Sequence, residues 1–157
     1  MKKINLVIIT VLLGILASCT NNEPKEQSGL ALIKTTNPNP IVLEKKSPHN
    51  LAVVADIEND IKSFKELYDV AIIKDRKDTL VAYKVRHLYR FKMKKIEKDL
   101  KEMLEEKYSD EKFIVSSDYK IFLEVVKLKE KMKNPDFSRK KAKKEMEKII
   151  KLRQEMA

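Results

Sequence analysis

From Leu51 onward, apolar residues recur at helical or strand spacing and divide the chain into successive elements. Residues 51–68 place apolar side chains three and four positions apart with charged residues between them, which predicts an amphipathic helix. Two runs rich in β-branched residues, 70–73 and 79–85, are separated by the charged residues 74–78. These runs predict two strands joined by a polar turn, and therefore a β-hairpin.

A second helix is predicted over 89–107, with an outer face of lysine and glutamate. Its apolar side comprises Phe91, Ile96, Leu100, Met103 and Leu104. A short strand over 113–115 follows, and residues 116–118 supply cap-type side chains for a third helix that ends at Asn134-Pro135. The apolar stripe of this third helix comprises Ile121, Val125, Leu128 and Met132.

The order helix, strand, strand, helix, strand, helix contains three strands and too few connections for a doubly wound sheet. We therefore predict an α+β fold, with a small mixed three-stranded sheet and the helices packed on one of its faces. The predicted domain spans residues 49–133. A basic C-terminal helix within residues 134–157 follows it, capped by Ser138 and running over 139–156, with Ala142, Met146, Ile149 and Arg153 in register.

The chain begins with an apolar run that leads to its only cysteine. Met1-Lys2-Lys3 is positively charged, the following region has the length of a secretory signal, and Leu16-Ala17-Ser18-Cys19 places small residues before a thiol. This pattern predicts a lipoprotein signal peptide over 1–18 and diacylglycerol on Cys19, which would hold the mature protein on a bilayer. The alternative of an uncleaved transmembrane helix is disfavoured, because the apolar run is shorter than the roughly 20 residues that span a membrane.

Residues 19–48 are predicted to be the lipidated cysteine and a flexible tether, since they contain four of the five prolines. Two apolar segments interrupt the tether, Leu30–Ile33 and Ile41–Leu43. They are docking segments, strands that join the sheet, or apolar patches without a partner. Without residues 1–18 the chain has 32 basic and 24 acidic side chains, a net charge of +8.

Several apolar runs resemble the core of the YhcN/YlaJ sporulation lipoproteins. These runs are Leu51 to Asp56, Val70 to Ile73 and Leu80 to Val85, and Ile114 to Asp118 is similar to the family's short strand before its closing helix. The resemblance covers about residues 49–133. It implies a non-catalytic lipoprotein of the spore inner membrane that binds lipid or protein and serves spore assembly or germination.

The sequence predicts neither a catalytic site nor a bound metal or cofactor. His49 and His87 lack partners at ligand spacing, whereas a zinc site needs three or four ligands. Ser116, Ser117, Asp118 and His87 are residue types of a hydrolase site, but there is no Gly-x-Ser-x-Gly elbow. The two glycines also leave no glycine-rich phosphate loop. We therefore predict that the protein is not an enzyme.

Residues 134–157 have eight basic and four acidic side chains and are the most basic segment for their length. The expected contacts to anionic lipid or wall polymer are Arg139, Lys140, Lys141, Lys143 and Lys144. The alternative is a solvated helical face that pairs with its own glutamates. Nucleic acid could bind the same cations, but an anchor outside the cytoplasm disfavours it as a partner.

Together these patterns favour a lipid-anchored module on the outer face of the cytoplasmic membrane, attached through diacylglycerol on Cys19. It would act at the spore inner membrane through lipid or through a spore or envelope protein. The alternative function is that of a general envelope lipoprotein that binds anionic lipid or wall polymer during growth.

Overall fold

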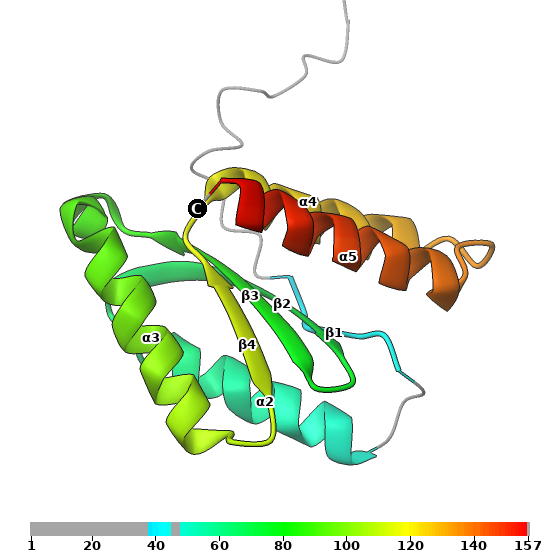
Figure 1. The fold of residues 1–157 in the computed structure, drawn as a ribbon, viewed down its shortest axis with the longest axis horizontal. Helices are drawn as coiled ribbons and strands as arrows, with labels where there is room; N and C mark the ends of the chain where they lie inside the picture. Colours follow the sequence, from blue (N-terminus) through cyan, green and yellow to red (C-terminus); the bar gives the residue numbers. More distant parts are fainter. Residues whose placement is uncertain (1–37, 45–47, 157) are drawn as a thin grey trace, which may run out of the picture. The chain divides into compact units, whose positions relative to one another are not determined.

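A mixed sheet of four strands, in the order β1-β2-β3-β4, forms the centre of the computed structural model, which describes residues 38–44 and 48–156 (Figure 1). Strands β1 and β2 are parallel, as are β3 and β4, whereas β2 and β3 form an antiparallel hairpin. The α+β class predicted from the sequence is confirmed. The strand bounds are β1 (Ile41–Val42), β2 (Leu67–Asp75), β3 (Asp78–Val85) and β4 (Lys112–Ser116).

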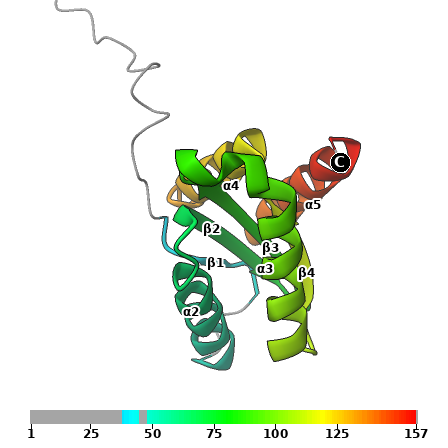
Figure 2. The ribbon, with the colours of Figure 1, turned by 90° about the vertical axis from the view of Figure 1, so that its left-hand side faces the viewer.

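The helices follow from this strand order, because each parallel pair needs a crossover connection of a dozen or more residues. Helix α2 connects β1 to β2, and the 3₁₀ helix η2 with α3 connects β3 to β4. Helices α4 and α5 come after the sheet is complete and lie side by side (Figures 1 and 2). The helix bounds are α2 (Pro48–Lys62), η2 (His87–Lys92), α3 (Met93–Lys107), α4 (Tyr119–Met132) and α5 (Arg139–Glu155).

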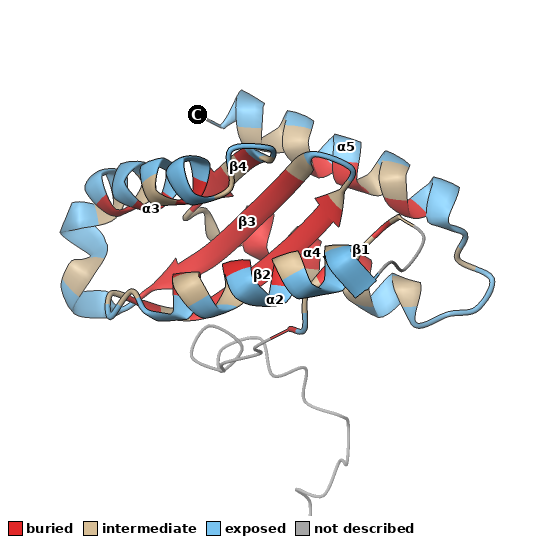
Figure 3. Cartoon of the chain, turned by 90° about the horizontal axis from the view of Figure 1, so that it is seen from below, coloured by how far each residue is buried: buried red, intermediate tan, exposed pale blue. Residues whose placement is uncertain are grey.

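The helices cover both faces of the sheet, so the prediction that they pack on one face is wrong. Helices α2 and α3 lie on one face, and α4 and α5 lie on the other (Figure 2). Strand β3 shows the reason, since Val81 and Tyr83 belong to the first core whereas Leu80 and Ala82 belong to the second. Both sets are buried (Figure 3), and a strand that is apolar on both faces needs a layer of helices on each.

The fourth strand comes from the end of the predicted tether. Ile41 pairs with Ile73 in parallel register, and the backbone N–H of Leu43 donates to the carbonyl of Lys74 at 2.8 Å. Leu43 is 1% exposed, which explains why this apolar segment joins the sheet. The prediction of three strands is therefore corrected to four. The signal peptide, Cys19 and Leu30–Ile33 lie outside the described residues.

Two predicted apolar stripes extend too far. Helix α2 ends at Lys62, and Tyr68 belongs to β2 rather than to the helix. Phe91 was expected on the buried side of the second helix, but it lies in η2 and is 81% exposed. In contrast, the stripe of α5 is confirmed, with Ala142 and Met146 buried against the second core.

A buried ion pair joins the central strands β2 and β3. The Lys84 Nζ lies 3.0 Å from the Asp69 Oδ2, and both residues are at most 5% exposed. The ammonium group also lies 4.4 Å from the ring centroid of Phe122, with the rings of Tyr68 and Tyr119 at 5.7 and 5.5 Å. At such distances aromatic faces attract a cation. This cluster ties the hairpin to α4.

A second buried lysine closes the other end of the hairpin. Lys74 is 2% exposed and pairs with the Glu111 carboxylate, which also accepts a hydrogen bond from the Thr79 hydroxyl at 3.0 Å. The Lys74 Nζ donates to the carbonyl of Arg76 as well. Arg76 begins the two-residue turn and has a φ of 51°, a region that few residues other than glycine and asparagine favour. The predicted turn over 74–78 is thus shorter and more tightly held than expected.

Candidate functional site

An open hollow of about 840 Å³ lies where the start of α3, the end of β4, the start of α4 and the end of α5 meet. Five cationic and two acidic side chains take part in its lining. The cations outnumber the carboxylates, so the hollow favours an anionic occupant. The cationic residues are Arg90, Lys94, Lys98, Lys101 and Arg153, and the acidic residues are Glu97 and Asp118.

A hydrogen-bonded network forms the floor of the hollow. The Arg153 Nη2 lies 2.9 Å from the Glu97 Oε1, and its Nε donates to the carbonyl of Val115 at 3.3 Å. The Ser117 hydroxyl donates to the second Glu97 oxygen at 3.1 Å. Because Arg153 lies near the end of α5 and Glu97 lies in α3, the network connects the C-terminal helix to the opposite helical layer and to β4.

The hydroxyl of Tyr83 is buried close to this network. Burial raises its pKa, and the negative charge of Glu97 adds to the increase. The nearby Ser117 hydroxyl opposes this increase, although no contact in the described part of the chain has the distance and angle of a hydrogen bond to the Tyr83 oxygen. Tyr83 therefore stays neutral at physiological pH, and Glu97 is paired with Arg153 at the floor of the hollow.

The cations on the rim differ from Arg153 in their partners. Lys98 and Lys101 lie near Glu102 and Glu105, at 3.6 and 3.5 Å, in exposed pairs one helical turn apart. Such pairs contribute about 0–1 kcal/mol and break easily. For Arg90 and Lys94, the described part of the chain records no ion pair. The rim can therefore present its positive charge to an approaching surface.

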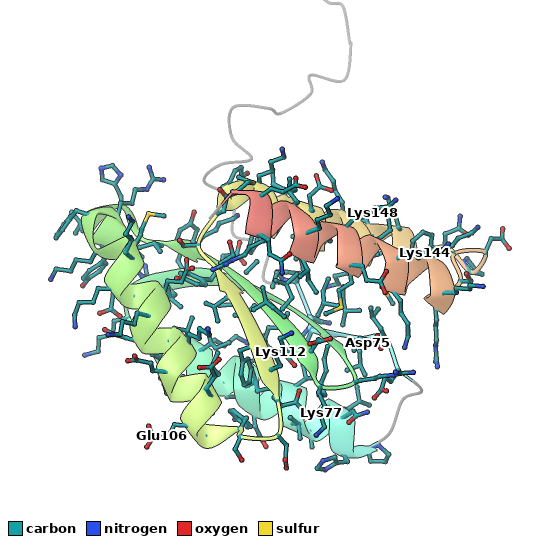
Figure 4. All side chains as sticks on the ribbon, in the orientation of Figure 1. Asp75, Lys77, Glu106, Lys112, Lys144 and Lys148 are labelled. Carbon is teal, nitrogen blue, oxygen red and sulfur yellow. The ribbon has the colours of Figure 1, made fainter. Side chains whose placement is uncertain are left out.

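The basic cluster predicted from the sequence lies at the start of α5, at the opposite end of the domain from η2 (Figures 1 and 3). Arg139, Lys140, Lys141 and Lys144 are exposed, and Figure 4 shows Lys144 on the outer side of α5. Lys143 instead turns toward the sheet, where its Nζ lies 2.8 Å from the Asp75 Oδ1. The two atoms form an ion pair without the geometry of a hydrogen bond. The cluster therefore has four outward cations rather than five.

The polar residues weighed as a hydrolase site have structural partners. The Asp118 Oδ1 accepts from the backbone N–H groups of Lys120 and Ile121 and caps α4. The Ser116 hydroxyl accepts from the backbone N–H of Asp118, and Ser117 donates to Glu97 as described above. Hydrogen bonds between these residues and His87 are absent from the described structure. His87 and His49 are both exposed.

Sequence reasoning missed the hollow and the exposed residues beside it. Phe91 was predicted to lie in the buried stripe of the second helix, and Leu88, which is 76% exposed, was not singled out. A signal was present, because residues 86–95 contain five basic residues and no acidic one, with apolar residues between them.

Within residues 38–44 and 48–156, no three histidine, cysteine, aspartate or glutamate side chains are grouped to hold a metal ion. The described helices also include none that is long and apolar enough to cross a membrane. No protein-family model matches this chain, and neither the curated proteins nor the solved structures contain a match.

Proposed function

We propose that this chain is a lipid-anchored, non-catalytic module on the outer face of the cytoplasmic membrane, held by diacylglycerol on Cys19. By its resemblance to the YhcN/YlaJ lipoproteins, it would serve spore assembly or germination through lipid or protein contacts at the spore inner membrane. The observation that supports this proposal most is the excess of outward cations at both ends of the described domain. Each lysine or arginine near an anionic bilayer contributes about 1 kcal/mol of attraction.

A non-catalytic role agrees with the partners of the polar residues in the hollow. Ser117 donates to Glu97, Asp118 caps a helix, and Glu97 is paired with Arg153. A nucleophile would need an adjacent base that is free to take its proton. These side chains instead connect helices, which favours a binding surface over a reaction centre.

Replacing Cys19 by alanine tests the anchor. We expect Cys19→Ala to leave an uncleaved and unlipidated precursor, because the thioether requires a thiol. The variant should move more slowly in gels and should lose the added mass of diacylglycerol. Ser18→Ala is the matched control, since it keeps a small residue before the cysteine. If Cys19→Ala changes neither the gel mobility nor the membrane fractionation, the lipoprotein proposal is wrong.

The second candidate is a general envelope lipoprotein that binds anionic wall polymer or lipid during growth. It is favoured by the four outward cations at the start of α5, Arg139, Lys140, Lys141 and Lys144. The place and timing of the protein distinguish the two candidates. A full-length protein tagged at Ala157 should appear only in the forespore membrane under the first proposal, and throughout the envelope of growing cells under the second.

Charge reversal tests the α5 cluster itself. We expect Lys140→Glu/Lys141→Glu/Lys144→Glu to abolish sedimentation with teichoic-acid-containing wall at physiological salt, because it replaces attraction by repulsion. Lys143 is left unchanged, since it faces Asp75. The control Lys62→Glu/Lys65→Glu/Lys77→Glu makes the same change of charge on exposed residues elsewhere. If binding survives the first triple variant, the α5 cluster is only a solvated face.

A further inference from the structure

The two most exposed large apolar side chains of the described domain lie together in η2. Leu88 is 76% exposed and Phe91 is 81% exposed. They are three residues apart in a 3₁₀ helix, which has three residues per turn, so their side chains lie on the same side of the helix. The two side chains therefore form one apolar tip that projects from the domain.

The backbone below this tip is held in place. The Arg86 Nε donates to the carbonyls of Lys65 and Leu67 at 3.0 and 3.2 Å, and the backbone N–H of Arg86 donates to the carbonyl of Glu66 at 2.8 Å. Tyr89 packs against the core formed with α2 and α3. Leu88 and Phe91 are thus presented by a segment that is tied to the domain through Arg86 and through half-buried Tyr89, and a partner would not have to order it first.

Cations lie beside the apolar tip. Arg90, Lys92 and Lys94 are exposed, and the Lys92 Nζ lies 5.6 Å from the ring centroid of Phe91. The basic hollow begins directly beside Phe91, which is one of its lining residues. Residues 86–95 contain no acidic side chain. Exposed apolar side chains beside lysine and arginine are typical of a segment that enters an anionic lipid interface.

We propose that η2 is a membrane-docking tip that inserts Leu88 and Phe91 into the headgroup region of an anionic bilayer, with Arg90, Lys92 and Lys94 on the lipid phosphates. The positive charge of Arg90, Lys92 and Lys94 favours an anionic bilayer as the partner of the apolar pair, because it is complementary to the negative charge of acidic phospholipid.

The lipid anchor on Cys19 would make this docking intramolecular, and in that respect the inference rests on the proposed function. Nineteen residue steps separate Cys19 from Pro38, the first described residue. Fully extended, they reach at most about 65 Å, so the domain of an anchored chain stays close to the bilayer. A second attachment then forms at a high effective concentration, and weak contacts suffice.

The chain has no tryptophan, which makes a single-tryptophan reporter possible. Lipidated full-length protein with Phe91→Trp is reconstituted in phosphatidylcholine vesicles that contain brominated lipid, with or without phosphatidylglycerol. The anchor holds the protein on both kinds of vesicle, so quenching of the reporter measures docking alone. We expect strong quenching and a blue shift only with phosphatidylglycerol, and their loss at high salt. Leu88→Trp is a second reporter, and Leu51→Trp on α2 is the control that should stay unquenched.

Neutralising the three cations beside the apolar tip tests the electrostatic part of the proposal. Added to the Phe91→Trp reporter, Arg90→Gln/Lys92→Gln/Lys94→Gln should weaken docking on the order of a hundredfold, since each cation near an anionic surface contributes roughly fivefold. The matched control, Lys140→Gln/Lys141→Gln/Lys144→Gln, should retain docking, because these lysines are in the first turns of α5, and α5 starts at the other end of the domain from η2 (Figure 1).

An absence of quenching in both η2 reporters on phosphatidylglycerol vesicles would overturn the docking tip and leave the apolar pair to a protein partner. Equal quenching without phosphatidylglycerol would overturn the role of the cations. The mass of the N-terminal peptide tests the anchor separately. If Cys19 carries no lipid, the proposed function fails, and the same reporters on the unanchored protein, added to preformed vesicles, still decide whether η2 docks.

Discussion

Replacing Asp69 by asparagine is expected to lower the free energy of unfolding by about 3–5 kcal/mol, the usual cost of breaking a buried ion pair by removing one partner. The substitution keeps the shape of the side chain and removes its charge. The Lys84 ammonium then remains buried without its carboxylate, among the rings of Phe122, Tyr68 and Tyr119. The aromatic faces attract the cation but do not replace a full negative charge.

Urea unfolding followed by circular dichroism measures this loss, as a lower midpoint at an unchanged slope. The exposed pair of Lys98 and Glu102 supplies the control, since Glu102→Gln should cost less than about 1 kcal/mol. The double variant Asp69→Leu/Lys84→Met should be more stable than Asp69→Asn, because apolar residues of similar volume often match or exceed a buried ion pair. A loss below about 1 kcal/mol for Asp69→Asn would show that water reaches the pair.

Replacing Glu111 by alanine is expected to cost a similar amount, about 3–5 kcal/mol. Glu111 precedes β4 and reaches across to the β2–β3 hairpin, where it pairs with buried Lys74 and accepts from Thr79. The variant leaves Lys74 with the carbonyl of Arg76 but without a negative charge. It also removes a connection between the β2–β3 turn and the start of β4, which pairs with the other edge of β3.

The neighbouring residue provides a matched control. The Lys112 Nζ lies 3.9 Å from the Asp78 Oδ1, and both side chains are at least half exposed. Lys112→Ala should therefore change the free energy of unfolding by less than about 1 kcal/mol in the same urea experiment. Equal losses for Glu111→Ala and Lys112→Ala would contradict the expectation that burial of Lys74 makes the first pair important.

Local spacing predicted most of the secondary structure. The stripe of α5 shows why, since Ala142, Met146 and Ile149 recur every three or four residues and all three are buried. Ser138 and Asp118 were likewise recognisable as caps, and their side chains accept from the backbone N–H groups of the first turns of α5 and α4. Such features depend on residues a few positions apart, which a single sequence contains.

Local spacing also produced the errors. Phe91 lies at helical distance from Ile96 and Leu100, so the pattern placed it in the buried stripe, but η2 interrupts the helix and turns Phe91 outward. Lys74 was placed in the predicted polar turn, and only its approach to Glu111, 37 positions away, allows Lys74 to be buried. The hollow could not be predicted for the same reason, because Glu97 and Arg153, which pair at its floor, are 56 positions apart.

The sequence by itself determined the α+β class, the order of most elements, the positive charge and the expectation of a lipid anchor at Cys19. Only the tertiary structure decided that Ile41–Val42 joins the sheet, that helices cover both of its faces, and that Lys143 turns toward Asp75. The physical reason is the range of the interactions. Periodicity, capping and charge are local properties of the chain, whereas strand pairing and buried ion pairs depend on which distant segments meet.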